Sequence, residues 1–71
     1  MTLHRILVVD DEAQIQSLLR IALGSAGYEI LAATTGHEAI RLAASAAPDA
    51  IILDLGLPDQ DGKDVLRDIK R

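Results

Sequence analysis

Residues 6–12 read I-L-V-V-D-D-E and residues 51–62 read I-I-L-D-L-G-L-P-D-Q-D-G, and these two stretches are the strongest indication of the chain's architecture. Each begins with a run of apolar residues, many of them β-branched, and the run ends in aspartate. Short apolar runs bounded by charge or turn residues are typical of strands buried on both faces of a parallel sheet. We therefore predict strands over residues 5–9 and 50–53, with Asp10, Asp11 and Asp54 at their carboxyl ends.

Helical spacing of apolar residues follows the first strand. The predicted stripe has positions i, i+3, i+4, i+7 and i+8, which form one face of a helix. Its members are Ile15, Leu18, Leu19, Ala22 and Leu23. The polar residues predicted on the opposite, solvent side are Gln14, Gln16 and Arg20. Gly24 and Gly27 are expected to end this helix.

The rest of the chain continues the alternation. Residues 28–33 predict a weaker strand whose polar content favours a sheet edge. Thr35 and Glu38 have the spacing of a capping box, so a second helix should begin there and end before Pro48. Val65 and the apolar residues after it predict a third helix. The order β-α-β-α-β-α implies parallel strands with right-handed crossovers.

Composition narrows the possible functions. The chain has 71 residues, of which 49% are hydrophobic and one, Tyr28, is aromatic, so we expect one compact unit with a core of Ile, Leu, Val and Ala. Seven basic against eleven acidic residues give a net charge of −4, which argues against direct nucleic-acid binding. No apolar stretch is long enough to cross a membrane, and no cleavable signal is recognisable. The absence of cysteine agrees with a reducing compartment, and the cytoplasm is the expected location.

Three carboxylates are predicted to converge, because ligands and side chains gather at the carboxyl ends of parallel strands. Like charges at short distance repel, so the cluster of Asp10, Asp11 and Asp54 calls for a cation. Oxygen ligands favour a hard ion such as Mg²⁺ over zinc. Asp54 is then a plausible nucleophile for phosphoryl transfer. Any one of these aspartates alone is more simply a cap or turn residue, and it is their conjunction that favours a site.

The two quoted stretches resemble the receiver domains of bacterial two-component response regulators. Within that family, Gly56 and Asp59 make the second stretch similar to the potassium-responsive Kdp regulators of the winged-helix, OmpR-like group. The resemblance implies a three-layer, flavodoxin-like (CheY-like) parallel sheet, here with strand order 2-1-3. It also implies that Asp54 accepts phosphate from a sensor histidine kinase, with Mg²⁺ held by Asp10, Asp11, Asp54 and the Gly56 carbonyl. Such a module is not itself an enzyme, and it controls transcription in the full-length regulator.

One departure from the family pattern leaves two functions open. Residues 1–71 are interpreted as a partial receiver domain that lacks the last two strands and helices, which carry the family's switch Ser or Thr and a phosphate-contacting Lys. Lys63 and Lys70 cannot replace that Lys. The alternative function is an inactive half-domain that only self-associates, as a homodimer paired through the exposed edge of its third strand. Whichever function holds, we expect the truncation to expose apolar surface around Leu19 and Leu23 and the chain to pair as a homodimer.

Other candidates are weaker. A haloacid-dehalogenase-like phosphatase needs a second aspartate two residues after the nucleophile, where this chain has Gly56. His4 and His37 lack partners at metal-ligand spacing and are predicted to face solvent. The remaining acids of the second stretch and the helix after it are interpreted as solvated side chains. These acids are Asp59, Asp61, Asp64 and Asp68.

Overall fold

The computed structural model describes residues 4–54, 59 and 62–69, and strands and helices alternate along them as predicted. The elements are β1 (Arg5–Val9), α1 (Ala13–Ser25), β2 (Glu29–Ala33), α2 (Gly36–Ala46), β3 (Ala50–Leu53) and α3 (Gly62–Ile69). The bounds of β1 and β3 are those predicted from their apolar runs. Helix α3 begins at Gly62, three residues before the first apolar residue of its predicted stripe.

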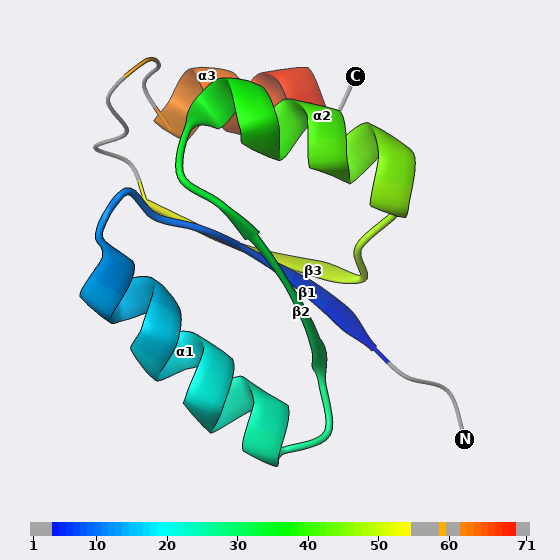
Figure 1. Ribbon diagram of the computed structural model, residues 1–71. Helices are drawn as coiled ribbons and strands as arrows, with labels where there is room; N and C mark the ends of the chain where they lie inside the picture. Colours follow the sequence, from blue (N-terminus) through cyan, green and yellow to red (C-terminus); the bar gives the residue numbers. More distant parts are fainter. Residues whose placement is uncertain (1–3, 55–58, 60–61, 70–71) are drawn as a thin grey trace.

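The three strands form one parallel sheet in the order β2-β1-β3. Strand β1 lies in the centre, with Ile6 opposite Ile30 of β2 and Ala50 of β3. Figure 1 shows α1 on one face of this sheet and α2 with α3 on the other. The predicted three-layer architecture and the edge position of β2 are therefore confirmed. Within the described ranges, no helix is long and apolar enough to cross a membrane.

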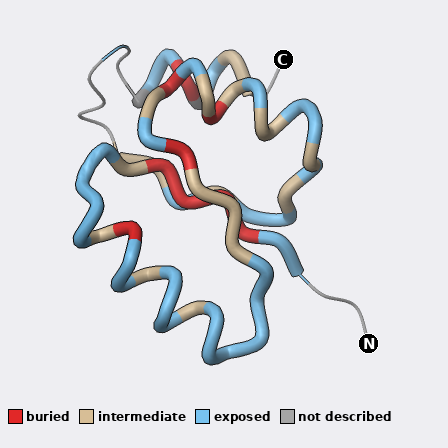
Figure 2. Tube along the Cα trace, viewed as in Figure 1, coloured by how far each residue is buried: buried red, intermediate tan, exposed pale blue. Residues whose placement is uncertain are grey.

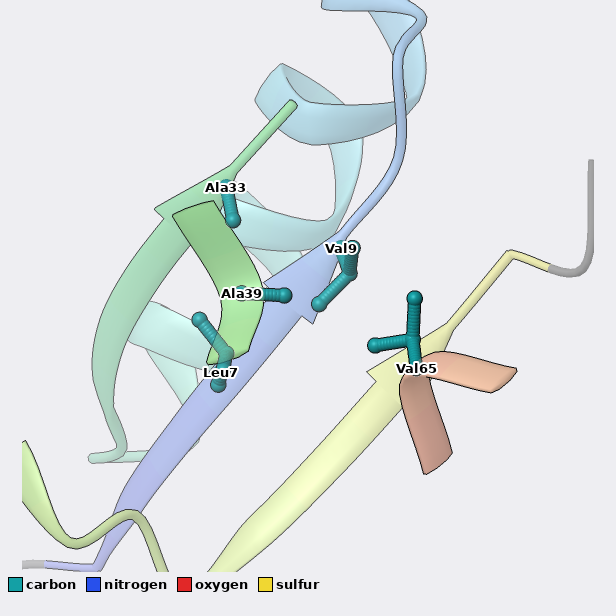
Figure 3. Packing of buried hydrophobic residues seen from close by; sticks show 5 residues of the cluster. All are labelled: Leu7, Val9, Ala33, Ala39 and Val65. Atoms are coloured by element: carbon teal, nitrogen blue, oxygen red, sulfur yellow. The ribbon is translucent and has the colours of Figure 1, made fainter. Parts of the chain in front are cut away.

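The main core lies between the sheet and the helix pair α2 and α3. Five residues with almost no exposed surface meet there, as Figure 3 shows. They are Leu7, Val9, Ala33, Ala39 and Val65. Alternation along β1 sends Leu7 and Val9 to this face, and Val65 brings α3 into the same core. Helix α3 therefore packs on the same sheet whose strands precede Asp10, Asp11 and Asp54.

The face covered by α1 differs from the sequence prediction. Ile15, Leu19 and Leu23 are half-buried, but Leu18 is 62% exposed and Ala22 is exposed as well. Gln16, predicted on the solvent side, is the one described residue of α1 that is buried, and Figure 2 shows most of the helix as exposed.

The helix is rotated about its axis relative to the predicted stripe, so that the i, i+4, i+8 row faces β1 and β2. Leu19 and Leu23 themselves are half-buried, and the exposed apolar surface expected around them lies on Leu18, Ile21 and Ala22. The large apolar side chains that α1 leaves exposed are Leu18 and Ile21, the latter at 69%.

The ends of α2 are set by local chemistry. The Thr35 side chain accepts a hydrogen bond from the Glu38 amide at 3.1 Å, as the capping box predicted. The Glu38 carboxylate reaches back to the amide of Thr34, one residue earlier than in the standard motif. At the other end Ala47 adopts a left-handed conformation with φ of 46°, which terminates the helix before Pro48.

Candidate functional site

Two backbone hydrogen bonds place the predicted aspartates at one edge of the sheet. The Asp10 amide donates to the Ala33 carbonyl at 3.0 Å, and the Asp54 amide donates to the Val9 carbonyl at 2.9 Å. Each bond extends a strand ladder by one residue beyond the assigned strands. Asp10 and Asp54 therefore leave adjacent strands, β1 and β3, at the same level and in the same direction.

The carboxylates of Asp10, Asp11 and Asp54 form a cluster. Each contributes an oxygen atom, and the three oxygens lie within 4.8 Å of one another. Asp10 and Asp54 are half-buried and Asp11 is exposed. The three side chains chosen from the sequence therefore meet, while Gly56, the fourth predicted ligand, lies outside the described residues.

The donor set of this cluster suits a hard divalent cation. All three groups are carboxylates, and the cluster is the one group of three or more His, Cys, Asp or Glu side chains at metal-binding distance in the described part of the chain. Their mutual repulsion falls when a cation lies between them. Partial exposure of the cluster leaves room for water ligands, which Mg²⁺ retains in proteins.

Asp10 is held from three sides. Its amide is bonded to Ala33, its carbonyl accepts a hydrogen bond from the Gln16 side-chain amide at 3.0 Å, and its carboxylate accepts one from the Glu12 amide at 2.9 Å. The last bond is the local turn that aspartate forms with the amide two residues ahead. The turn from β1 into α1 thus fixes the backbone from which Asp10 and Asp11 project.

Asp59 has a role that the sequence did not reveal. Its carboxylate is exposed, as expected, but it accepts hydrogen bonds from the amides of Gly36 at 2.7 Å and His37 at 3.0 Å, at the start of α2. These two bonds hold the pKa of Asp59 below its ordinary value. The interpretation of Asp59 as a purely solvated acid is therefore wrong. Its partners are more than 20 residues away in sequence, so no local motif could have identified them.

The predicted exposure of both histidines is confirmed. His4 and His37 are exposed and neither belongs to the acidic cluster.

Comparison with known proteins gives consistent matches. The family model for the response regulator receiver domain matches residues 6–71. Among curated proteins, the transcriptional regulatory protein KdpE of Mycobacterium tuberculosis is 56% identical over 61 residues, which are 86% of this chain and 27% of that protein. The chain thus spans about a quarter of the length of this relative.

Solved structures share the fold. The chemotaxis protein CheY4 of Vibrio cholerae superposes with a TM-score of 0.93 at 32% identity, over 97% of this chain and 57% of that one. The response regulator TrrA of Thermotoga maritima, solved in complex with Mg²⁺ and BeF, superposes with a TM-score of 0.91 at 43% identity, over 96% of this chain and 59% of that one. Both likenesses extend over nearly all of the chain, so the CheY-like fold predicted for it is confirmed.

Proposed function

The chain belongs to the family of response regulator receiver domains, and from this membership we propose that it is a phosphoacceptor module of a two-component signalling system. In this proposal Asp54 accepts the phosphoryl group, and Asp10 and Asp11 hold Mg²⁺ beside it. The observation that carries the proposal is the meeting of these three carboxylates within 4.8 Å at the carboxyl edge of the sheet. The Gly56 carbonyl is proposed as a further ligand on the family resemblance alone.

The proposed reaction transfers a phosphoryl group to Asp54. A carboxylate oxygen of Asp54 attacks phosphorus, an acyl phosphate bond forms, and the bond from phosphorus to the donor breaks, so that its electrons leave with the donor. When bound, Mg²⁺ would offset the charge of the incoming phosphoryl group. Asp10 and Asp11 would act as its ligands, and the backbone bonds of Asp10 and Asp54 keep both groups at the same edge. Asp54 is itself modified in this reaction and keeps the phosphoryl group, so we propose that the module is an acceptor and not an enzyme.

The family also suggests the partners. We infer that a sensor histidine kinase supplies the phosphoryl group and that the full-length regulator controls transcription, in line with the name of the KdpE relative. A cytoplasmic location agrees with the absence of cysteine. The net charge of −4 favours control of transcription through another domain over direct contact between this segment and DNA.

Phosphorylation of the purified chain tests the proposal. The chain is incubated with acetyl phosphate and Mg²⁺, and the added phosphoryl group is followed by intact mass, with beryllofluoride binding followed by NMR in parallel. We expect modification that requires Mg²⁺ and disappears in Asp54→Asn. The matched control is Asp64→Asn, because Asp64 is a surface aspartate of α3 paired with Arg67 and outside the cluster. Modification that persists in Asp54→Asn would refute the assignment.

A second function, self-association without phosphoryl chemistry, is favoured by a specific observation. Strand β3 pairs only with β1 among the described strands, so its other edge is open, and Ile52 on this strand is 41% exposed. Leu18 and Ile21 add exposed apolar surface on α1. Open strand edges recruit further strands, and two copies paired through β3 would form one six-stranded sheet.

Sedimentation velocity separates this alternative from a monomeric acceptor. We expect a dimer at low micromolar concentration that Ile52→Lys disrupts, because lysine on an edge strand opposes pairing. A compact monomer at all concentrations would rule out self-association. Phosphorylation of such a monomer on Asp54 would then support the acceptor function.

A further inference from the structure

Gln16 makes an unusual set of contacts above the carboxyl ends of β1 and β2. The residue is only 8% exposed. Its side-chain Nε2 donates to the carbonyls of Val8 at 3.1 Å, Asp10 at 3.0 Å and Ala33 at 2.8 Å. Since all three partners are acceptors, only the NH₂ end of the amide can face them, and one of its two hydrogens is shared.

One of these bonds acts directly on the acidic cluster. The Asp10 carbonyl belongs to the peptide that joins Asp10 to Asp11, so a donor on that carbonyl sets the orientation of the peptide from which both carboxylates project. Ala33, the second partner, also accepts the Asp10 amide. Gln16 therefore ties the Asp10–Asp11 peptide to the end of β2 as well as to β1.

A packing role alone does not account for the choice of glutamine. Gln16 Oε1 is buried and has no hydrogen-bond partner within the described residues, and an unpaired buried acceptor is unfavourable compared with an apolar atom of the same size. A methionine would fill a similar volume without that acceptor. What glutamine adds is the pair of donors, and these are directed at the backbone of the cluster.

We propose that Gln16 is a positioning residue for the cation site: it fixes the Asp10–Asp11 peptide and thereby raises the affinity of the cluster for Mg²⁺. This inference rests on the proposed function, because it assumes that the cluster binds Mg²⁺. Groups that orient metal ligands from outside typically change metal affinity by about tenfold or more. Gln16 contacts the backbone that carries Asp10 and Asp11 and not their carboxylates, so we expect a change in Mg²⁺ affinity of about tenfold.

NMR of the unmodified chain gives the first test. Mg²⁺ is titrated while the side-chain NH₂ resonances of Gln16 and Gln14 are followed together with the backbone amides of Asp10 and Asp11. Gln14 is exposed on the same helix and serves as the internal control. We expect the Gln16 NH₂ signals to shift with the same dissociation constant as the two aspartate amides, while Gln14 does not move. Aspartate shifts without any Gln16 response would overturn the inference.

A matched pair of variants gives the second test. Gln16→Met should weaken Mg²⁺ binding about tenfold, and Gln14→Met should leave it unchanged, both measured on protein shown by circular dichroism to be folded. A folded Gln16→Met with wild-type Mg²⁺ affinity would overturn the positioning role and leave the proposed function intact. Absence of Mg²⁺ binding in the wild type would overturn both. If Gln16→Met does not fold, the NH₂ titration of the wild type decides the question.

Discussion

Asp11→Asn is expected to change the stability of the chain in opposite directions with and without Mg²⁺. At the 4.8 Å limit of the cluster, two unit charges repel by about 0.9 kcal/mol in a medium as polar as water. Asp11 faces two such neighbours, so its neutralisation removes about 1.7 kcal/mol of repulsion. The lost charge near the start of α1 offsets about 0.3 to 1 kcal/mol of this gain. The Mg²⁺-free variant should therefore be more stable than the wild type by about 1 kcal/mol.

Saturation with Mg²⁺ should reverse this order. The wild type gains stability through binding to the folded state, and loss of one ligand that weakens binding tenfold removes about 1.4 kcal/mol of that gain. Urea unfolding followed by circular dichroism, at about 10 mM salt so that screening is weak, measures both conditions.

Glu12→Gln is the matched control, because Glu12 begins the same helix but lies outside the cluster. We expect this variant to be slightly destabilised in both conditions. If Asp11→Asn behaves like Glu12→Gln with and without Mg²⁺, the electrostatic account of the cluster is refuted.

Three further predictions concern the scaffold around the site. Because the bonds of Asp59 to α2 lower its pKa, the wild type should be more stable than Asp59→Asn above the ordinary pKa of 3.8, and this advantage should disappear as pH falls through the folded-state pKa. Urea unfolding across this pH range measures the difference in stability, and a difference that does not depend on pH would contradict the prediction. Val65→Ala should destabilise the chain by about 2 to 3 kcal/mol, because it removes two buried methylene equivalents and leaves a cavity. Leu18→Ala, at an exposed position, should change stability by less than about 0.5 kcal/mol. Similar denaturation midpoints for the two variants would be inconsistent with the observed burial. Ala47→Gly should stabilise the folded chain by about 0.5 to 1 kcal/mol, because relieving the strain of a left-handed alanine outweighs the extra conformational entropy that glycine gives the unfolded chain. A lower melting temperature for this variant would show that the strain is absent.

Sequence reasoning succeeded where local chemistry determines the structure. The apolar runs at residues 5–9 and 50–53 predicted β1 and β3 to the residue, because a short apolar segment closed by charge has few alternatives. Thr35 predicted the start of α2, since a capping side chain acts within one turn of the chain. The convergence of Asp10, Asp11 and Asp54 followed from parallel topology once the strands were known.

Sequence reasoning failed where a polar side chain serves a distant backbone group. Hydrophobic periodicity treats every glutamine as a surface residue, so it assigned Gln16 to solvent, although its side chain donates to the buried carbonyls of Val8 and Ala33. Asp59 was missed because its partners begin α2, which lies beside α3 in the fold but more than 20 residues earlier in the sequence. In both cases the deciding contact joins segments that become neighbours only after the sheet has formed.

The central position of β1 also affects the order in which the chain can fold during synthesis. Ile6 pairs with Ala50, so β1 cannot complete its hydrogen bonds until a strand 44 residues later has been synthesised. At about 5 to 20 residues per second, that interval lasts roughly 2 to 9 seconds. During this time Leu7 and Val9 have no β3 or α3 to cover them, which makes the nascent chain a candidate for chaperone binding before its acidic edge exists.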